Sequence, residues 1–175
     1  MRHPFKRIPN GYRSATSGFA LIAPLLAAIL AWVPGALFAQ EGLTRPTDLR
    51  QEAALMQGHK MPMLVLFSQA GCSYCEKARV HYIGPMASRP PWQDRALYRQ
   101  IDLDSDDALI GFDGSAQSHR SFAKAAGVFV TPTVMVFGPD GTSLAEPIVG
   151  VTLPDFYGQY LEQAIEVARE KLVAH

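Results

Sequence analysis

The chain has 175 residues, and 16 lysines and arginines balance 16 aspartates and glutamates, for a net charge of zero. Proteins that bind nucleic acids usually carry an excess of basic residues, and this chain has none, so we expect no nucleic-acid partner. The length is enough for one domain whose core needs no disulfide staples.

The N-terminal segment has the pattern of an export signal. Four basic side chains occur in the first thirteen residues, residues 19–38 are uncharged and mostly apolar, and the small residue Ala39 follows. We predict that residues 1–39 are a signal peptide cleaved after Ala39. Twenty apolar residues could also cross a bilayer, so an uncleaved membrane anchor is the alternative. In both cases residues 40–175 form an exported domain, whose net charge is −4.

The rest of the chain alternates between helix and strand signals. Capping residues, apolar runs and Gly or Pro breaks predict these elements: a helix from Thr47 or Asp48 to Gln57 closed by Gly58; a strand over 61–67; a helix over 72–83 stopped by Gly84-Pro85; a connector over 88–93; a strand over 97–103 with Leu97, Ile101 and Leu103 inward; an acidic loop with a small hairpin near 110–113; a helix over 118–126; a strand over 134–137; an edge strand over 143–149; and an amphipathic helix from Pro154.

This order predicts an α/β fold. One helix comes first, a strand–helix–strand unit follows, and a further helix separates this unit from a β-hairpin and a closing helix. Such a chain builds a central mixed sheet of about four strands, with helices on both faces.

The two cysteines lie three residues apart, directly after the apolar run at 63–67. A disulfide between Cys72 and Cys75 closes so short a loop that it stabilises the fold little. At a strand-to-helix junction, however, the helix dipole and unpaired N–H groups favour the thiolate, which attacks disulfides. The pattern therefore predicts a redox couple rather than a structural bridge.

The Cys-x-x-Cys at the start of this helix, together with Thr131-Pro132 before the hairpin, resembles the thioredoxin superfamily. The resemblance covers about residues 47–173, and it is strongest to exported single-domain proteins: periplasmic thioredoxins associated with sulfur oxidation, and periplasmic disulfide reductases and isomerases. It implies a thioredoxin-like domain over residues 40–175 and a periplasmic location, at the inner membrane if the N-terminal segment is retained.

The resemblance also assigns roles to individual residues. It implies that Cys72 is the attacking cysteine and Cys75 the resolving one. Pro132 matches the cis-proline beside the active site, and Thr131 is the preceding residue, whose backbone would pair with an extended substrate. Without the cysteines, a trans proline at the entry to a strand would explain Pro132 equally well.

Two positions depart from the thioredoxin pattern. Gly71 stands where thioredoxins carry tryptophan before the first cysteine, and Leu66 stands where they bury a carboxylate. Glu76 is the candidate substitute proton relay, although a solvated helix residue is the plainer interpretation. Ser73 and Tyr74, between the cysteines, are expected to contact substrate and to influence the reduction potential.

We therefore expect a thiol–disulfide oxidoreductase that reduces or isomerises protein disulfides, with a membrane electron donor to re-reduce it. It needs no cofactor beyond the Cys72–Cys75 pair, binds no metal and is a monomer. Two alternatives remain open. The cysteines could bind Cu(I), with Met61, Met63 or His81 as a further ligand, or the domain could be a non-catalytic binding or chaperone module.

Overall fold

The computed structural model describes residues 43–174. The predicted export segment, residues 1–39, lies outside the described residues. The elements are α2 (Leu49–His59), β1 (Met63–Ser68), α3 (Ser73–Ala78), the π-helix η1 (Arg79–Ile83), α4 (Gly84–Ser88), the 3-10 helix η2 (Trp92–Asp94), β2 (Leu97–Asp102), β3 (Ala108–Ile110), β4 (Ala116–Ser118), α5 (His119–Ala125), β5 (Thr133–Phe137), β6 (Ile148–Val149) and α6 (Pro154–Ala174).

The central sheet has the strand order β2-β1-β5-β6. β1 pairs with β2 in parallel and with β5 antiparallel, and β5 pairs antiparallel with β6. This is the mixed four-stranded sheet that the sequence predicts. β3 and β4 form a separate hairpin beside it.

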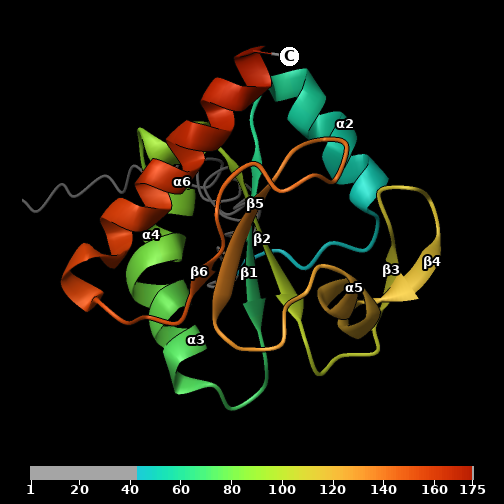
Figure 1. The fold of residues 1–175 in the computed structure, drawn as a ribbon, viewed down its shortest axis with the longest axis horizontal. Coiled ribbons are helices and arrows are strands. Elements are labelled where there is room, and N and C mark those ends of the chain that lie inside the picture. The colour runs from blue at the N-terminus through green and yellow to red at the C-terminus, as the bar shows by residue number, and fades with distance from the viewer. Residues whose placement is uncertain (1–42, 175) are drawn as a thin grey trace, which may run out of the picture. The chain divides into compact units, whose positions relative to one another are not determined.

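Helices cover both faces of the sheet (Figure 1). On one face, buried residues of α4 and α6 such as Met86 and Leu161 pack against Leu64 and Leu66 of β1. On the other face, α2 and α5 pack against alternate residues of the same strand. Because β1 and β5 are covered on both sides, every residue of these two strands is buried, as their continuous apolar runs indicate.

Among residues 43–174, no helix combines the length and the apolar character needed to cross a membrane.

The helix that begins after Cys72 does not stop at Gly84-Pro85, and the predicted end was wrong. It continues through the π-helix η1 into α4 and ends at Ser88. A proline removes one N–H and its ring crowds a carbonyl in an ordinary helical turn. Here the backbone N–H of Gly84 bonds to the carbonyl of Arg79, five residues earlier, so the wider turn accommodates Pro85.

Other boundaries also differ from the predictions. α2 extends through Gly58 and ends at His59, and its C-cap Lys60 adopts the left-handed conformation with φ 54°. The hairpin near residues 110–113 is larger than expected, since β3 and β4 flank that turn. The edge strand shrinks to β6, because Pro147 cannot donate a ladder hydrogen bond.

The burial of β2 also departs from the prediction. Ile101 is buried as expected, but Leu97 and Leu103 are only partly buried, whereas Tyr98 and Gln100 lie in the interior. No local pattern indicates that Gln100 would be only 2% exposed.

Candidate functional site

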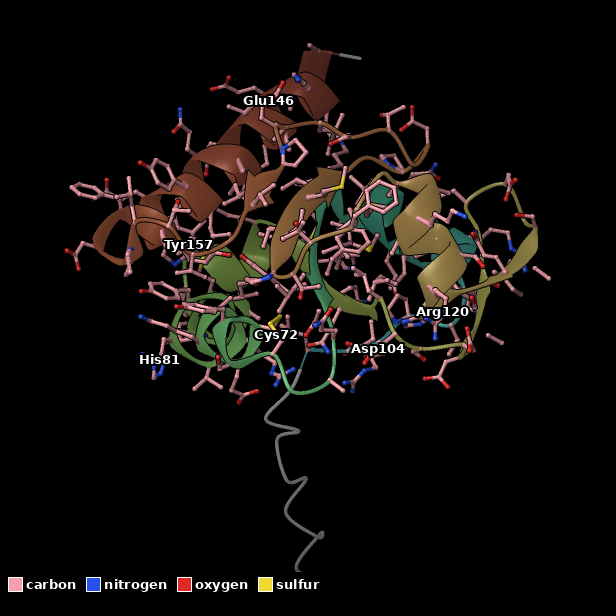
Figure 2. All side chains as sticks on the ribbon, turned by 60° about the horizontal axis from the view of Figure 1, so that its bottom comes forward. Cys72, His81, Asp104, Arg120, Glu146 and Tyr157 are labelled. Atoms are coloured by element: carbon pink, nitrogen blue, oxygen red, sulfur yellow. A yellow bond between two sulfur atoms is a disulfide. The ribbon has the colours of Figure 1, made fainter. Side chains whose placement is uncertain are left out.

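Three loops meet at one end of the sheet. Ser68 at the end of β1 pairs with Asp102 at the end of β2, because these strands are parallel, and Phe67 pairs with Thr133 at the start of antiparallel β5. The cysteine loop, the acidic loop after β2 and the Thr131-Pro132 segment therefore gather at the same edge. Figure 2 shows Cys72 and Asp104 at this end, far from Glu146.

Cys72 and Cys75 form a disulfide, with their Cα atoms 5.2 Å apart. Cys72 is the N-cap of α3, and its sulfur accepts a hydrogen bond from the backbone N–H of Cys75 at 3.1 Å. Cys72 is partly exposed, whereas Cys75 is only 1% exposed. An incoming sulfur can therefore reach Cys72, while Cys75 can react only with its neighbour.

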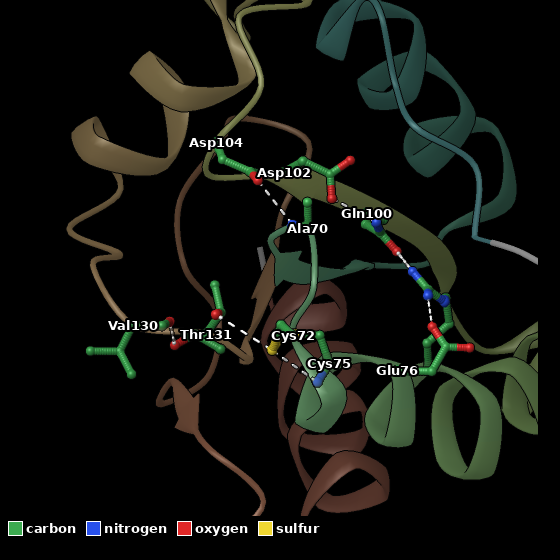
Figure 3. The surroundings of a disulfide bond; sticks show 11 residues. Ala70, Cys72, Cys75, Glu76, Gln100, Asp102, Asp104, Val130 and Thr131 are labelled. Atoms are coloured by element: carbon green, nitrogen blue, oxygen red, sulfur yellow. Dashed lines mark hydrogen bonds and ion pairs between the residues drawn. A yellow bond between two sulfur atoms is a disulfide. The ribbon is translucent and has the colours of Figure 1, made fainter.

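The Thr131–Pro132 peptide bond is cis. It brings the Thr131 hydroxyl to 3.7 Å from the Cys72 sulfur, within hydrogen-bond range for a sulfur acceptor (Figure 3). The next residue, Thr133, donates its hydroxyl to the carbonyl of Val130 at 2.7 Å, which holds this turn. The segment thus forms a wall, which we call the Thr131 wall, beside the reactive sulfur.

Exposed apolar side chains occur in the cysteine loop and in the segment before the cis peptide bond. Phe129 and Val130, just before the cis peptide bond, are 73% and 57% exposed. Tyr74, between the cysteines, is 61% exposed. We call these three residues the apolar rim. Side chains of this kind bury apolar area when another protein docks.

On the other side of Cys72 lies an open polar cleft of about 560 Å³. The loop from Ser68 to Ser73 forms one wall, and the segment from Asp102 to Ser105 forms another. The side chains of Glu76, Arg79, Gln100 and Arg45 complete the lining. Cys72 therefore stands between the Thr131 wall and the cleft; Figure 3 shows it with Thr131 on one side and the lining residues Gln100 and Glu76 on the other.

A chain of hydrogen bonds connects the polar groups of the cleft. Arg79 donates to Glu76 and, at 2.9 Å, to the side-chain oxygen of Gln100. Gln100 in turn donates to Asp102 at 2.6 Å, and Arg45 donates to the other oxygen of Asp102. Because the buried Gln100 is bonded on both sides, it orients one cation and one anion of the wall.

The acidic loop is held close to the cysteine loop. The Asp104 carboxylate accepts the backbone N–H of Ala70 at 2.9 Å, two residues before Cys72. Arg120 of α5 donates to the backbone carbonyl of Asp104 at 2.8 Å and to the carboxylate of Asp106. Its guanidinium lowers the pKa of Asp106. These bonds place a carboxylate beside the cysteine loop.

The structure brings together most of the residues that the sequence singles out. Ser73 lines the cleft and Tyr74 is exposed in the first turn of α3. Glu76 lines the cleft with its carboxylate bonded to Arg79, and its role as a proton relay stays a prediction. Leu66 is fully buried, so the described structure has an apolar side chain at that position.

Sequence reasoning missed several residues of the cleft, among them Arg45, Arg79, Gln100 and Asp104. Only one of these four had a recognisable signal, the three-residue spacing between Glu76 and Arg79, which is typical of an ion pair on a helix. Gln100 and Asp104 join the site through strand pairing and a loop contact, which have no local signature.

The structure offers little support for the alternative that the cysteines bind Cu(I). Among residues 43–174, no group of three or more His, Cys, Asp or Glu side chains could hold a metal ion. Met63 belongs to the core on the α2 and α5 face, opposite the face covered by the helices that follow Cys72.

Comparison with known proteins agrees with this fold. The family model of the thioredoxin-like domain matches residues 49–165. No curated protein matches the chain.

Three similar solved structures are thioredoxin-like proteins. Mitochondrial thioredoxin 3 from Saccharomyces cerevisiae is 19% identical, with a TM-score of 0.47 over 71% of this chain and 93% of that one. The periplasmic thioredoxin SoxS from Paracoccus pantotrophus is 18% identical, with a TM-score of 0.44 over 61% and 98%. The C-terminal domain of DsbD from Neisseria meningitidis is 21% identical, with a TM-score of 0.46 over 69% and 99%.

The family match spans most of the chain and includes both cysteines, which the structure joins in a disulfide. The chain therefore belongs to the thioredoxin-like domain family, and its Cys-x-x-Cys pair is that of a thiol–disulfide oxidoreductase.

Proposed function

We propose that this protein is an exported enzyme that reduces, or isomerises, protein disulfides through a dithiol–disulfide cycle of Cys72 and Cys75. The observation that carries the proposal is the difference between the two sulfurs. Cys72 is accessible, caps a helix and lies 3.7 Å from the Thr131 hydroxyl, whereas Cys75 is buried behind it.

In the reaction, the Cys72 thiolate attacks one sulfur of a substrate disulfide and expels the other as a thiolate. The backbone N–H of Cys75 and the helix N-terminus stabilise negative charge on Cys72. Cys75 then attacks Cys72, the mixed disulfide breaks, and the second substrate thiolate leaves. Two electrons pass to the substrate, and the two departing thiolates take up the two protons that the cysteines lose.

The apolar rim supports a protein as the substrate. Phe129 and Val130 directly precede the cis peptide bond beside Cys72. Tyr74 lies two residues after Cys72 in the chain. An extended substrate segment could pair with the backbone at Thr131 while its apolar side chains cover the rim. Glu76, in the first turn of α3, is the proposed proton relay for Cys75.

Turnover requires an outside source of electrons. We propose a membrane electron donor that reduces the Cys72–Cys75 disulfide, in keeping with export of residues 40–175 to the periplasm under direction of residues 1–39. The domain acts as a monomer, and retention of the N-terminal segment would keep it at the inner membrane.

Insulin reduction in the presence of a small dithiol tests the proposal. The wild-type domain should accelerate the reaction, and Cys72→Ser should abolish the acceleration. Cys75→Ser should instead accumulate a mixed disulfide with substrate, because the buried partner can no longer resolve it. Equal activity of wild type and Cys72→Ser would refute the proposal.

The reduction potential decides the direction of exchange. Reduction potentials in this fold range from about −270 mV for strongly reducing members to about −120 mV for strongly oxidising ones. A value nearer the reducing end of this range supports a reductase.

A further inference from the structure

The polar cleft gives Cys72 a second approach, separate from the apolar rim. Its volume of about 560 Å³ is that of a small-molecule site, since such sites span about 300–1,000 Å³. A docking protein covers a broad surface, whereas this cleft is concave and has Cys72 among its lining residues. A small disulfide that entered it would reach the same atom.

The cleft carries charges of both signs in fixed positions. Arg45 uses one N–H to bind Asp102, and a guanidinium has five, so donors remain for a carboxylate. Asp104 accepts one bond from Ala70, and a carboxylate has about four acceptor sites, so capacity remains for an ammonium group.

Much of the rest of the wall is bonded within the protein. Arg79 binds both Glu76 and Gln100, and Gln100 also binds Asp102. Gln100 is 2% exposed and therefore cannot swing out. The cleft thus keeps one cation, Arg45, and two carboxylates with acceptor capacity, Asp104 and Glu76, and groups of both signs match a zwitterion.

We propose that the cleft binds low-molecular-weight disulfides of the cystine type, in which each sulfur is carried by an α-amino acid. Arg45 binds the α-carboxylate and Asp104 the α-ammonium group, which places the disulfide against Cys72. This inference rests on the proposed dithiol cycle and adds to it a second substrate class.

The reaction balances as in the protein case. Reduced Cys72 attacks one sulfur of cystine and forms a mixed disulfide, and one cysteine thiolate leaves. Cys75 then breaks the mixed disulfide and the second thiolate leaves. The dithiol is oxidised by two electrons, and two molecules of cysteine are released with the two protons.

Single-turnover oxidation of the reduced protein tests this, because it needs no electron donor. Four disulfides serve as probes: cystine, cystamine with only ammonium groups, dithiodiglycolate with only carboxylates, and neutral hydroxyethyl disulfide. Each rate constant is divided by that of free mercaptoethanol with the same disulfide, which removes differences in intrinsic reactivity. We expect the normalised rate for cystine to exceed that for hydroxyethyl disulfide about tenfold.

Three charge-neutralising variants locate the effect. Arg45→Gln should lower the rates for cystine and dithiodiglycolate about tenfold and leave the cystamine rate within about threefold. Asp104→Asn keeps an acceptor for Ala70 and should lower the rates for cystine and cystamine instead. Arg50→Gln, which breaks an exposed ion pair with Asp48 outside the cleft lining, is the matched control and should change none of them.

The outcomes separate the two proposals. Equal normalised rates for cystine and the neutral disulfide, or a uniform decrease with all four probes in Arg45→Gln, would overturn the cleft assignment while insulin reduction persists. A wild-type protein that reduces neither insulin nor any of the four probes would overturn the dithiol cycle itself.

Discussion

Tyr157 of α6 is buried, and its hydroxyl has no hydrogen-bond partner among the described residues. The side chain is 1% exposed and its ring lies 5.0 Å from that of Tyr82. Burial, with a smaller contribution from Tyr82, raises the pKa of Tyr157 from 10.0 to about 12. A hydroxyl without a partner in an apolar core opposes folding, so its removal should stabilise the protein.

The variant Tyr157→Phe makes this quantitative. At pH 8 it should raise the free energy of unfolding by about 1 kcal/mol, because a desolvated hydroxyl is removed. Above pH 10 the unfolded phenol of the wild type ionises while the folded one stays protonated, so stability is lost as pH rises. With pKa values of 10.0 and about 12, ionisation of Tyr157 lowers the stability of the wild type by about 1.4 kcal/mol at pH 11, and the variant lacks this contribution.

Urea denaturation of the oxidised protein at pH 8 and pH 11 measures both effects, since disulfide-bonded cysteines do not titrate. The gap between variant and wild type should widen by about 1.4 kcal/mol at the higher pH. Tyr82→Phe is the control, because the Tyr82 hydroxyl bonds to the carbonyl of Pro154 at 3.0 Å; this variant should be less stable by about 1 kcal/mol at pH 8. A gap that stays constant or narrows with pH would refute the reasoning.

Three other substitutions probe different parts of the structure. Gly84→Ala places a Cβ 2.9 Å from the backbone oxygen of Arg79, so urea denaturation should show a free energy of unfolding lower by about 1–3 kcal/mol. An unchanged free energy of unfolding would mean that the π-helix accommodates the methyl group without strain. Thr131→Val removes the hydroxyl beside Cys72 and should slow alkylation of the reduced protein by iodoacetamide roughly threefold at pH 7, whereas an unchanged rate would rule out that hydrogen bond. Glu52→Ala leaves its arginine partner on β2 unpaired in a largely buried site and should lower the free energy of unfolding by about 3 kcal/mol, with wild-type stability as the contrary result.

The order and type of most elements were predictable because their signals are local. Apolar runs identify β1 and β5, which are buried on both faces. Ser118 caps α5 as expected, with its hydroxyl accepting the N–H of Ser121 at 3.2 Å, and Pro154 begins α6. Capping and periodicity act within a few residues, so the sequence alone displays them.

The end of the helix after Cys72 was not predictable in this way. Gly84-Pro85 ordinarily breaks a helix, and the π-helix that accommodates it forms within a packed layer where Ile83 and Met86 are buried. Packing on both sides of a break can favour a continued helix, and no local pattern records that contribution.

The same division applies to the site. The sequence by itself determined the reactive pair, because a Cys-x-x-Cys at a strand-to-helix junction is a local pattern with a local chemical consequence. Thr131 and Pro132 entered only through the resemblance to a family. Only the tertiary structure decided what surrounds Cys72. Parallel pairing of β1 with β2 brings Gln100 and Asp104 to the cysteine loop, and a hydrogen bond to Asp102 brings Arg45. These contacts join residues about 30 or more positions apart, and their formation depends on strand register and burial, which no single segment of the chain encodes.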